Sequence, residues 1–474
     1  MKSRVVACLM VAGLLASACG AKGADEAADN DKATQTTAAG STETTAAGDS
    51  ASKFGSIASP CGKADSVAKV KADEAGTGTD KLYIGVGNDR DSIRPGLLKE
   101  LWDGTNAFVK WCNEQGGING LQLEAVDLDG KVLEVEAAMA KACTDVFAIV
   151  GGGWAQDNFI FSGKDGADFH KCKMISFPGF AVSTDFAEGS DQVQPLPNPA
   201  YDKPASAMVA LAKLYPDEVK KFGVVYGTLP SIIQNKDQII GVAKQTKGFD
   251  QFDEIGYDII NQDWAVIAQQ VLDKGLKAVS FVGEPPNMSK FSQALRDQGF
   301  DGVINADANQ YDSRLIGASG PAAVEGAIVR IASHTYEEAD KWPAMGQLVK
   351  ILDSWDPAWE RAGLATQAFS ASLLFATAAK SCADAGEISR ACVLQAGKDV
   401  HEWDGGGLHA VADPGANTPA DCAMLVQIKD GKFERLFPEL GSEDDNGEGF
   451  FCSPTVKLTG DFGKGNTDSS ILGS

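Results

Sequence analysis

Histidine and positive charge are both scarce in this chain of 474 residues. Only four residues are histidine, which leaves little material for a metal centre built from several imidazoles. Lys and Arg together number 42 against 65 Asp and Glu, so the formal net charge is −23. A chain this acidic repels phosphate backbones and anionic headgroups, and its composition therefore argues against nucleic-acid binding and electrostatic docking on a membrane.

Long apolar runs are also missing beyond the N-terminus, where no later stretch reaches the ~20 apolar residues of a spanning helix. At the start of the chain, Lys2 and Arg4 precede an apolar run over residues 5–16, followed by small residues. This pattern predicts an export signal, and the run itself is too short to span a bilayer.

The segment Leu15-Ala16-Ser17-Ala18-Cys19 resembles the lipobox of bacterial lipoproteins. The resemblance implies that residues 1–18 are a lipoprotein signal peptide and that Cys19 carries a lipid anchor. The protein would then be exported and held at the outer face of the cell membrane. An ordinary signal peptide that is cut nearby is the alternative.

Residues 19–59 are rich in Ala, Thr, Gly, Ser, Asp and Glu, and the pentapeptide TTAAG occurs at 36–40 and again at 44–48. Almost no large apolar residue interrupts this composition. Such a segment cannot bury a core, so the sequence predicts a disordered tether between the lipid and the folded part.

Eight cysteines remain once Cys8 of the signal and Cys19 are set aside, and an even number in an exported protein indicates up to four disulfides. The favoured pair is Cys382 with Cys392, because a ten-residue loop closes at little entropic cost. Cys422 with Cys452 comes next. The pairing of the other four is left open, and metal binding is disfavoured because no CxxC or paired His accompanies the cysteines. These four are Cys61, Cys112, Cys143 and Cys172.

From residue 81 onward, short apolar runs alternate with amphipathic segments, a pattern typical of parallel sheets flanked by helices. The first series has expected strands at 82–86, 121–128, 146–150 and 174–178, with helices at 101–114, 132–144 and 157–170. The second has strands at 222–226, 254–259, 278–282 and 302–305, with helices at 205–214, 232–245, 264–274 and 288–298. The fold class is therefore α/β, with two doubly wound parallel-sheet lobes. Ligands of such sheets bind beyond the carboxyl ends of the strands.

Four stretches, in order, resemble one known family: residues 113–120 (NEQGGING), 324–327 (VEGA), 365–379, and 428–433 (IKDGKF). They are similar to motifs of type I periplasmic binding proteins, the leucine/isoleucine/valine-binding-like solute-binding lipoproteins of ABC importers. The resemblance implies two lobes joined by three crossovers near Asn198, Glu325 and residues 405–413. Lobe 1 would comprise 60–198 plus 326–405, and lobe 2 would comprise 199–325 plus 406–474.

The resemblance also implies a function. A small polar metabolite, amino-acid-like or amide-like, would be captured by hinge closure in a cleft between the two lobes and delivered to an ABC permease. A ligand sensor of the same fold, coupled to a signalling partner, is the alternative. No cofactor, metal or enzymatic activity is expected, since none of the four histidines lies in a G-x-S-x-G-like context.

The expected ligand-binding residues lie in loops that follow strands. After the third strand come Trp154, Gln156 and Asp157, where amino-acid-binding relatives usually carry Ser or Thr. Trp154 is read as a stacking wall, with core packing as the alternative, and Asp157 could instead cap the helix that follows.

The remaining candidates come from the loop after the fourth strand and from the second lobe. Among these, Glu284 is the first choice for an ammonium or hydroxyl group of the ligand. Each could instead be a cap or turn residue. The remaining candidates are Phe180, Ala181, Thr184, Tyr226, Glu284 and Asn309.

Overall fold

The computed structural model describes residues 53–72, 74–157 and 171–465. The expected signal peptide, Cys19, most of the expected tether and the helix expected at 157–170 lie outside these residues, apart from Asp157. Within the described ranges, every helix is too short or too polar to cross a membrane.

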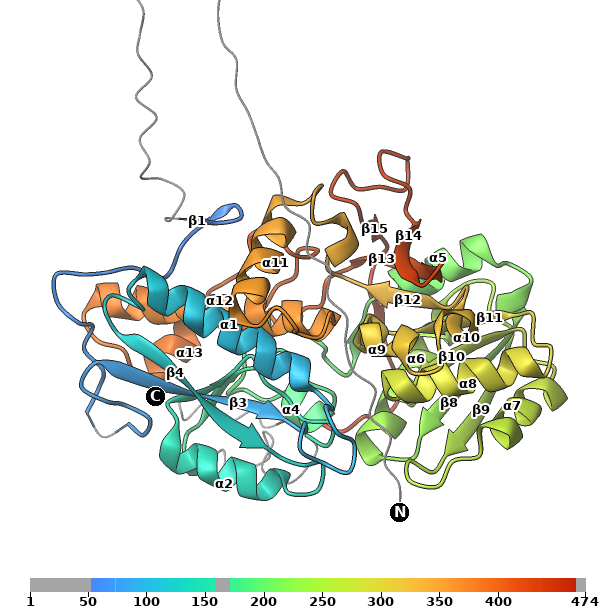
Figure 1. Ribbon diagram of the computed structural model, residues 1–474, viewed down its shortest axis with the longest axis horizontal. Helices are drawn as coiled ribbons and strands as arrows, with labels where there is room; N and C mark the ends of the chain where they lie inside the picture. Colours follow the sequence, from blue (N-terminus) through green and yellow to red (C-terminus); the bar gives the residue numbers. More distant parts are fainter. Residues whose placement is uncertain (1–52, 73, 158–170, 466–474) are drawn as a thin grey trace, which may run out of the picture. The chain divides into compact units, whose positions relative to one another are not determined.

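The first sheet contains four parallel strands in the order β4 (Gln122–Asp129), β3 (Lys81–Asn88), β5 (Ala148–Val150) and β6 (Ile175–Phe177). Helix α2 (Val135–Asp145) lies on the opposite side of this sheet from α1 (Lys99–Gln115) and α12 (Gly363–Ala385) (Figure 1). Helix α1 ends at Gly116, whose φ of 118° a residue with a side chain rarely adopts. The helices and strands expected for this lobe are confirmed in the described residues.

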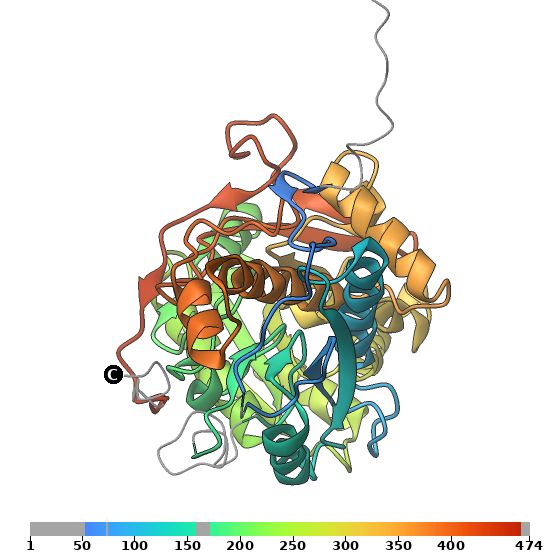
Figure 2. The same ribbon diagram turned by 90° about the vertical axis from the view of Figure 1, so that its left-hand side faces the viewer.

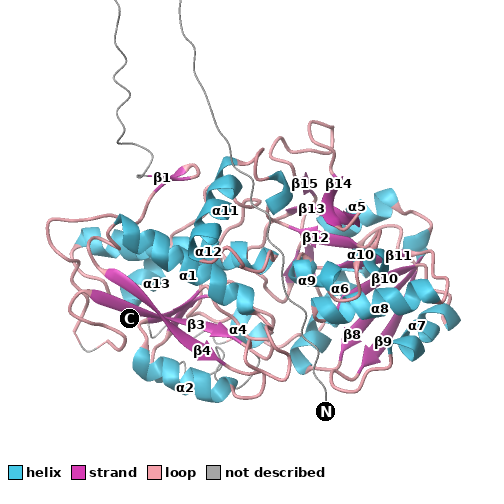
Figure 3. Ribbon diagram, viewed as in Figure 1, coloured by secondary structure: helices cyan, strands magenta, loops and turns pink. Residues whose placement is uncertain are grey.

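The second sheet is built on five parallel strands, in the order β9 (Gln251–Tyr257), β8 (Lys221–Gly227), β10 (Ala278–Val282), β11 (Val303–Ala306) and β12 (Ile328–Ile331). Every residue of the central strand β10 is buried, as expected for a strand covered on both faces. Figure 3 shows the strands in magenta as two separate groups. The covering helices are α5 (Ser206–Leu214), α6 (Pro230–Gln245), α7 (Trp264–Asp273) and α8 (Pro285–Asp297).

Antiparallel strands extend this second sheet beyond β12. Strand β13 (Cys422–Lys429) pairs with β12, with β14 (Lys432–Phe437) and with β15 (Phe451–Cys452). A further two-stranded sheet joins β16 (Val456–Lys457) to β7 (Asp202–Lys203). The sheet is therefore mixed, whereas the strand pattern predicted a purely parallel one. Three short helices lie in the connections between strands. Helix α4 (Thr184–Ala187) follows β6 of the first sheet, and α9 (Ser313–Gly317) and α10 (Pro321–Val324) lie between β11 and β12 of the second.

The second crossover lies later than the sequence suggested. It was expected near Glu325, with residues 326–405 in lobe 1, but the buried run of β12 still pairs with β11 and β13. Residues 332–335 then leave the sheet beside 408–410 of the third crossover. His334 N–H donates to Leu408 O at 2.9 Å, and Ala410 N–H donates to Ala332 O at 2.7 Å. Helices α11 (Pro343–Trp355), α12 and α13 (Arg390–Lys398) lie between these two crossovers.

The expected tether is wrong at its end, because residues 53–58 form a hairpin of β1 (Lys53–Phe54) and β2 (Ile57–Ala58). The Phe54 side chain is fully buried, with its ring centroid 4.9 Å from that of Phe369 and 5.7 Å from that of Trp111. Ile57 packs against the same cluster, and the hairpin backbone is hydrogen-bonded to Gly406 and Gln347, so the segment is docked onto the core. From the hairpin, residues 59–72 run between the end of α1 and the start of α13 (Figure 2).

Four disulfides link the eight cysteines other than Cys8 and Cys19. Cys382–Cys392 joins α12 to α13 and Cys422–Cys452 joins β13 to β15, which are the two pairs that the sequence favoured. Cys61–Cys112 and Cys143–Cys172 are the pairs that it left open.

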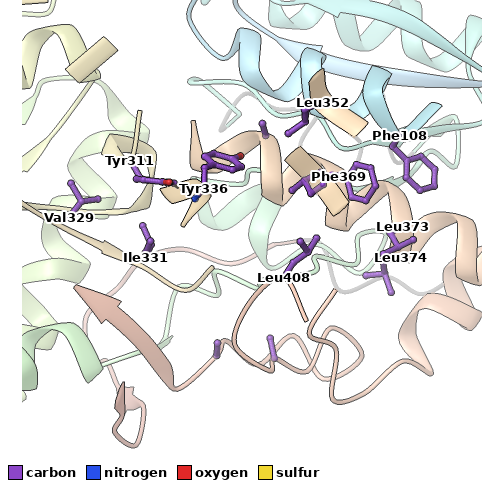
Figure 4. Close-up of a cluster of buried hydrophobic side chains, with 14 of the residues drawn as sticks. Phe108, Tyr311, Val329, Ile331, Tyr336, Leu352, Phe369, Leu373, Leu374 and Leu408 are labelled. Carbon is purple, nitrogen blue, oxygen red and sulfur yellow. Dashed lines mark hydrogen bonds between the residues drawn. The ribbon is translucent and has the colours of Figure 1, made fainter. Parts of the chain in front are cut away.

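One apolar cluster connects the two sheets. It runs from Val329 and Ile331 of β12 through Tyr336 to Phe369 of α12 and Phe108 of α1 (Figure 4). The α12 helix is therefore a shared structural support for the loops at the strand ends of both lobes.

Candidate functional site

A cavity of about 460 Å³ is lined by the loops that follow strands in both sheets. From the first lobe, the lining includes loops after β3, β5 and β6, and from the second, loops after β9, β10 and β11. The predicted position of the cleft, at the carboxyl ends of the strands, is therefore where the cavity lies. The lining residues at these strand ends are 93–95, 97–98, 155, 179–182, 257, 259, 283–287 and 306–309.

Side chains from both lobes make polar contacts beside the cavity. Arg314 Nη2 donates to Glu100 Oε2 of α1 at 2.7 Å, and Arg314 also pairs with Asp312. Ser231 of α6 donates its hydroxyl to Ala155 O at 2.9 Å. These contacts join the first lobe to the second within the same site.

Trp154 is part of the core and does not line the cavity, which corrects its reading as a stacking wall. Its side chain is fully buried, and the indole N–H donates to Leu128 O at 2.9 Å. Gly87 and Gly130 pack directly against its ring, where any added Cβ would lie within 3 Å. The sequence could not separate these roles, because a tryptophan after a strand suits either.

Gln156 and Asp157 also lie behind the cavity wall. Gln156 Nε2 donates to Val132 O at 3.4 Å. The Asp157 carboxylate accepts the backbone N–H groups of Val182 and Ser183 at 2.7 and 2.8 Å, and burial raises the pKa of Asp157 to about 6. Asp157 thus shapes the neighbouring loop, which does line the cavity, and neither it nor Gln156 is among the lining residues.

Of the candidates in the next loop, Phe180 and Ala181 line the cavity and Thr184 does not. Thr184 is buried, and its backbone N–H donates to Gln234 Oε1 of α6 at 3.4 Å. Tyr226, at the end of β8, is likewise outside the lining. Tyr257 at the end of the adjacent strand β9 lines it instead, because the two parallel strands end at the same edge.

Glu284 and Asn309 both line the cavity, as predicted, but each already has a protein partner. Glu284 Oε1 lies 3.1 Å from Arg94 Nε of the first lobe, and burial raises the pKa of Glu284 while Arg94 opposes the shift. Asn309 Nδ2 donates to Gly283 O at 2.9 Å. Glu284 is therefore one half of an ion pair across the site.

Lys203 is the main residue that the sequence reasoning missed. It lines the cavity, is 6% exposed, and donates from Nζ to Asn198 Oδ1 at 2.6 Å. Burial lowers the pKa of Lys203 to about 7, although Asp307 and Glu188 oppose the shift. Its only sequence signal was its place in the first crossover, between Asn198 and Pro204, where a chain segment borders a cleft.

A model of the family described as periplasmic binding protein matches residues 81–432. A search of curated protein sequences finds no match.

Three solved structures share the fold. A leucine-binding protein of Thermotoga maritima aligns with a TM-score of 0.60 and 18% identity, over 75% of this chain and 97% of that one. A fatty acid ABC transporter substrate-binding protein of Thermomonospora curvata aligns with a TM-score of 0.64 and 15% identity, over 84% of this chain and 97% of that one. A branched-chain amino acid transporter substrate-binding protein of Streptococcus pneumoniae, in complex with isoleucine, aligns with a TM-score of 0.58 and 16% identity, over 76% of this chain and 100% of that one. The family and these neighbours are substrate-binding proteins rather than enzymes.

Proposed function

Because the chain belongs to the periplasmic binding protein family, we propose that it is an extracytoplasmic solute-binding lipoprotein. It captures a small metabolite in the cavity between its lobes and delivers it to an ABC permease of the cell membrane. The two lobes move about the three crossovers, and ligand contacts to both sets of loops favour the closed arrangement.

The observation that carries this proposal is the cavity itself, which is lined by strand-end loops of both sheets. A ligand that touches both sets of loops binds more tightly when the lobes are close, so its binding energy shifts their equilibrium. The ion pairs Arg314–Glu100 and Arg94–Glu284 are further contacts that form between the lobes.

The amino-acid-like or amide-like ligand expected from the sequence needs an acceptor for its nitrogen. Three acidic side chains line the cavity, and each is paired with an arginine. Glu284 pairs with Arg94, Asp307 with Arg330 at 2.8 Å, and Glu100 with Arg314. The polar contacts for such a ligand would therefore come from backbone groups and from amides such as Asn309.

The lipid anchor and the permease partner are supported by the sequence. The lipobox-like segment before Cys19, followed by a tether without large apolar residues, suits a receptor held near a membrane transporter. In cells, Cys19→Ser should move the protein from the membrane fraction to the soluble fraction. If it stays in the membrane fraction, the anchor is elsewhere.

Ligand capture is tested by a thermal-shift screen of small metabolites followed by small-angle scattering. A ligand should raise the unfolding midpoint by mass action and reduce the radius of gyration at saturation. Ala207→Trp, which places an indole in the cavity, should abolish both effects while the four disulfides still form. An unchanged radius at saturation would contradict closure, and a permease-deficient strain that still takes up the ligand normally would contradict delivery.

A further inference from the structure

Cationic side chains outnumber carboxylates around the cavity, although the whole chain carries a formal charge of −23. Five cations line it against three carboxylates, and one of the cations, Lys290, is exposed to solvent. Each of the three arginines lies beside a carboxylate: Arg94 with Glu284, Arg314 with Glu100, and Arg330 with Asp307. The remaining cation is Lys203, so the excess of positive charge favours an anionic ligand at this residue.

The ammonium group of Lys203 is buried without a carboxylate partner. Within residues 53–72, 74–157 and 171–465, no carboxylate oxygen lies within 4.0 Å of Nζ, whose hydrogen bond goes to the neutral Asn198. An ammonium group has three N–H donors, so Nζ can donate further hydrogen bonds to a ligand. A buried charge without a counter-ion is unfavourable, and a ligand anion would supply that counter-ion.

Beyond Lys203 a large part of the cavity wall is apolar and belongs to the core of the second lobe, with Asn235 and Gln238 of α6 as polar members of the lining. Met208 and Leu211 of α5 face it, together with Val242 of α6, Val282 of β10 and Leu425 of β13. Protein interiors are normally packed without voids larger than a water molecule. A cavity lined by residues of both these helices and the second sheet therefore provides space for an apolar guest.

We propose that the cavity binds an aliphatic monocarboxylate, with the carboxylate against Lys203 and the hydrocarbon chain between α5, α6 and the second sheet. This ligand assignment rests on the solute-binding function proposed above. One negative charge matches Lys203, the buried lining cation that has no carboxylate within ion-pair distance, and the chain matches the apolar part of the wall.

Two other ligand classes match the same wall less well. A zwitterionic amino acid would bring an ammonium group to a site where Glu284 and Asp307 each already bind an arginine. A sugar would bring several hydroxyl groups into contact with Met208, Leu211 and Val242, which offer neither donors nor acceptors.

Chain length provides the first test. The full chain carrying Cys19→Ser, which avoids detergent, is stripped of bound lipid and titrated calorimetrically with hexanoate, octanoate, decanoate and dodecanoate below their micelle concentrations. Each methylene group that enters the cavity should lower Kd about fourfold, until the cavity is filled and Kd levels off. Absence of binding by all four probes, or a Kd independent of chain length, would overturn the assignment.

The headgroup is tested by comparing decanoate with 1-decanol. Decanoate should bind at least tenfold more tightly, and Lys203→Gln should remove that advantage, because a hydrogen bond to a charged group is lost. Lys203→Arg should retain it. The matched control is Lys213→Gln in the helix that follows Lys203, α5. Lys213 is an exposed lysine paired with Asp444, and the change should leave both affinities unchanged. Equal binding of decanol and decanoate, or an unaltered decanoate affinity in Lys203→Gln, would overturn the role of Lys203.

Titrations with L-leucine and L-glutamine separate this assignment from the proposed function. Binding of an amino acid without binding of any aliphatic carboxylate keeps the solute-binding function and overturns the ligand class. If neither kind of probe binds and the radius of gyration never changes, both proposals fail.

Discussion

Replacing Lys203 by Met should stabilise the unliganded protein, most strongly near neutral pH. Burial lowers the pKa of Lys203 from 10.5 in the unfolded chain to about 7 in the folded protein. Between these values the unfolded chain holds a proton that the folded protein does not, so the stability of the wild type rises with pH. The slope is about 1.4 kcal/mol per pH unit. The destabilisation that the buried Lys203 ammonium group causes is therefore absent above about pH 10.5 and grows to its full size as the pH falls to about 7.

The measurement is urea denaturation of wild type and Lys203→Met at pH 7.5, 8.5 and 9.5, with disulfides intact. Because Met does not titrate, the advantage of the variant should shrink by roughly 3 kcal/mol over these two pH units. Lys213→Met is the control, since this exposed lysine pairs with Asp444 and should give a difference that does not change with pH in the same way. A constant difference between wild type and Lys203→Met would refute the reasoning, because it would mean that the folded protein keeps Lys203 charged throughout.

Three further variants test other parts of the structure. Arg314→Met should destabilise the protein by about 3–5 kcal/mol in denaturation, because it leaves the buried Glu100 without its counter-ion. Phe54→Ala should cost about 3–5 kcal/mol and lower Tm, because it removes a fully buried ring from the core. His409→Gln should make the protein less sensitive to acid: burial lowers the pKa of His409 to about 4. The wild type therefore loses about 1.4 kcal/mol per pH unit relative to the variant as the pH falls from about 6.5 to about 4.

Each of these variants has an exposed counterpart as a control. Lys380→Met breaks a surface pair with Asp384, Lys53→Ala changes the residue beside Phe54, and His401→Gln changes a histidine whose side chain is 57% exposed. All three should leave the measured stability close to that of the wild type. A loss in Lys380→Met or Lys53→Ala as large as that of its buried counterpart, or a change of acid sensitivity in His401→Gln equal to that in His409→Gln, would show that the buried contacts are not responsible.

The strands and helices were predictable because their hydrophobic periodicity is strong. Strand β10 occupies residues 278–282 as predicted, and α7 differs from its predicted end by one residue. The errors occur where one long-range contact decides the outcome. Phe54 lies in a polar segment and is buried only because α1 and α12 leave room for its ring. Strand β12 has the pattern of any short apolar run, and its place is set by pairing with β11 and β13.

The loops around the cavity were predictable, but the residues within them less so. The rule that ligands bind beyond strand ends placed Phe180, Ala181, Glu284 and Asn309 at the cavity, whereas it could not say that Trp154 points into the core. In a helix or strand the direction of a side chain follows from the regular period of the element, whereas an irregular loop has no such period, so the direction cannot be predicted from sequence. Lys203 was missed for a related reason: a lysine is normally exposed, and only the folded chain shows that this one is buried.

The two features that were hardest to read from the sequence both lower the stability of the unliganded protein. An open space among Met208, Leu211 and Val242 forfeits packing contacts, and an ammonium group at Lys203 without a carboxylate beside it forfeits solvation. A chain under selection for stability alone could fill the space with larger side chains and replace the lysine. One ligand with an apolar chain and a single negative charge would relieve both costs at once, which is why we read the cavity wall and Lys203 as parts of one binding site.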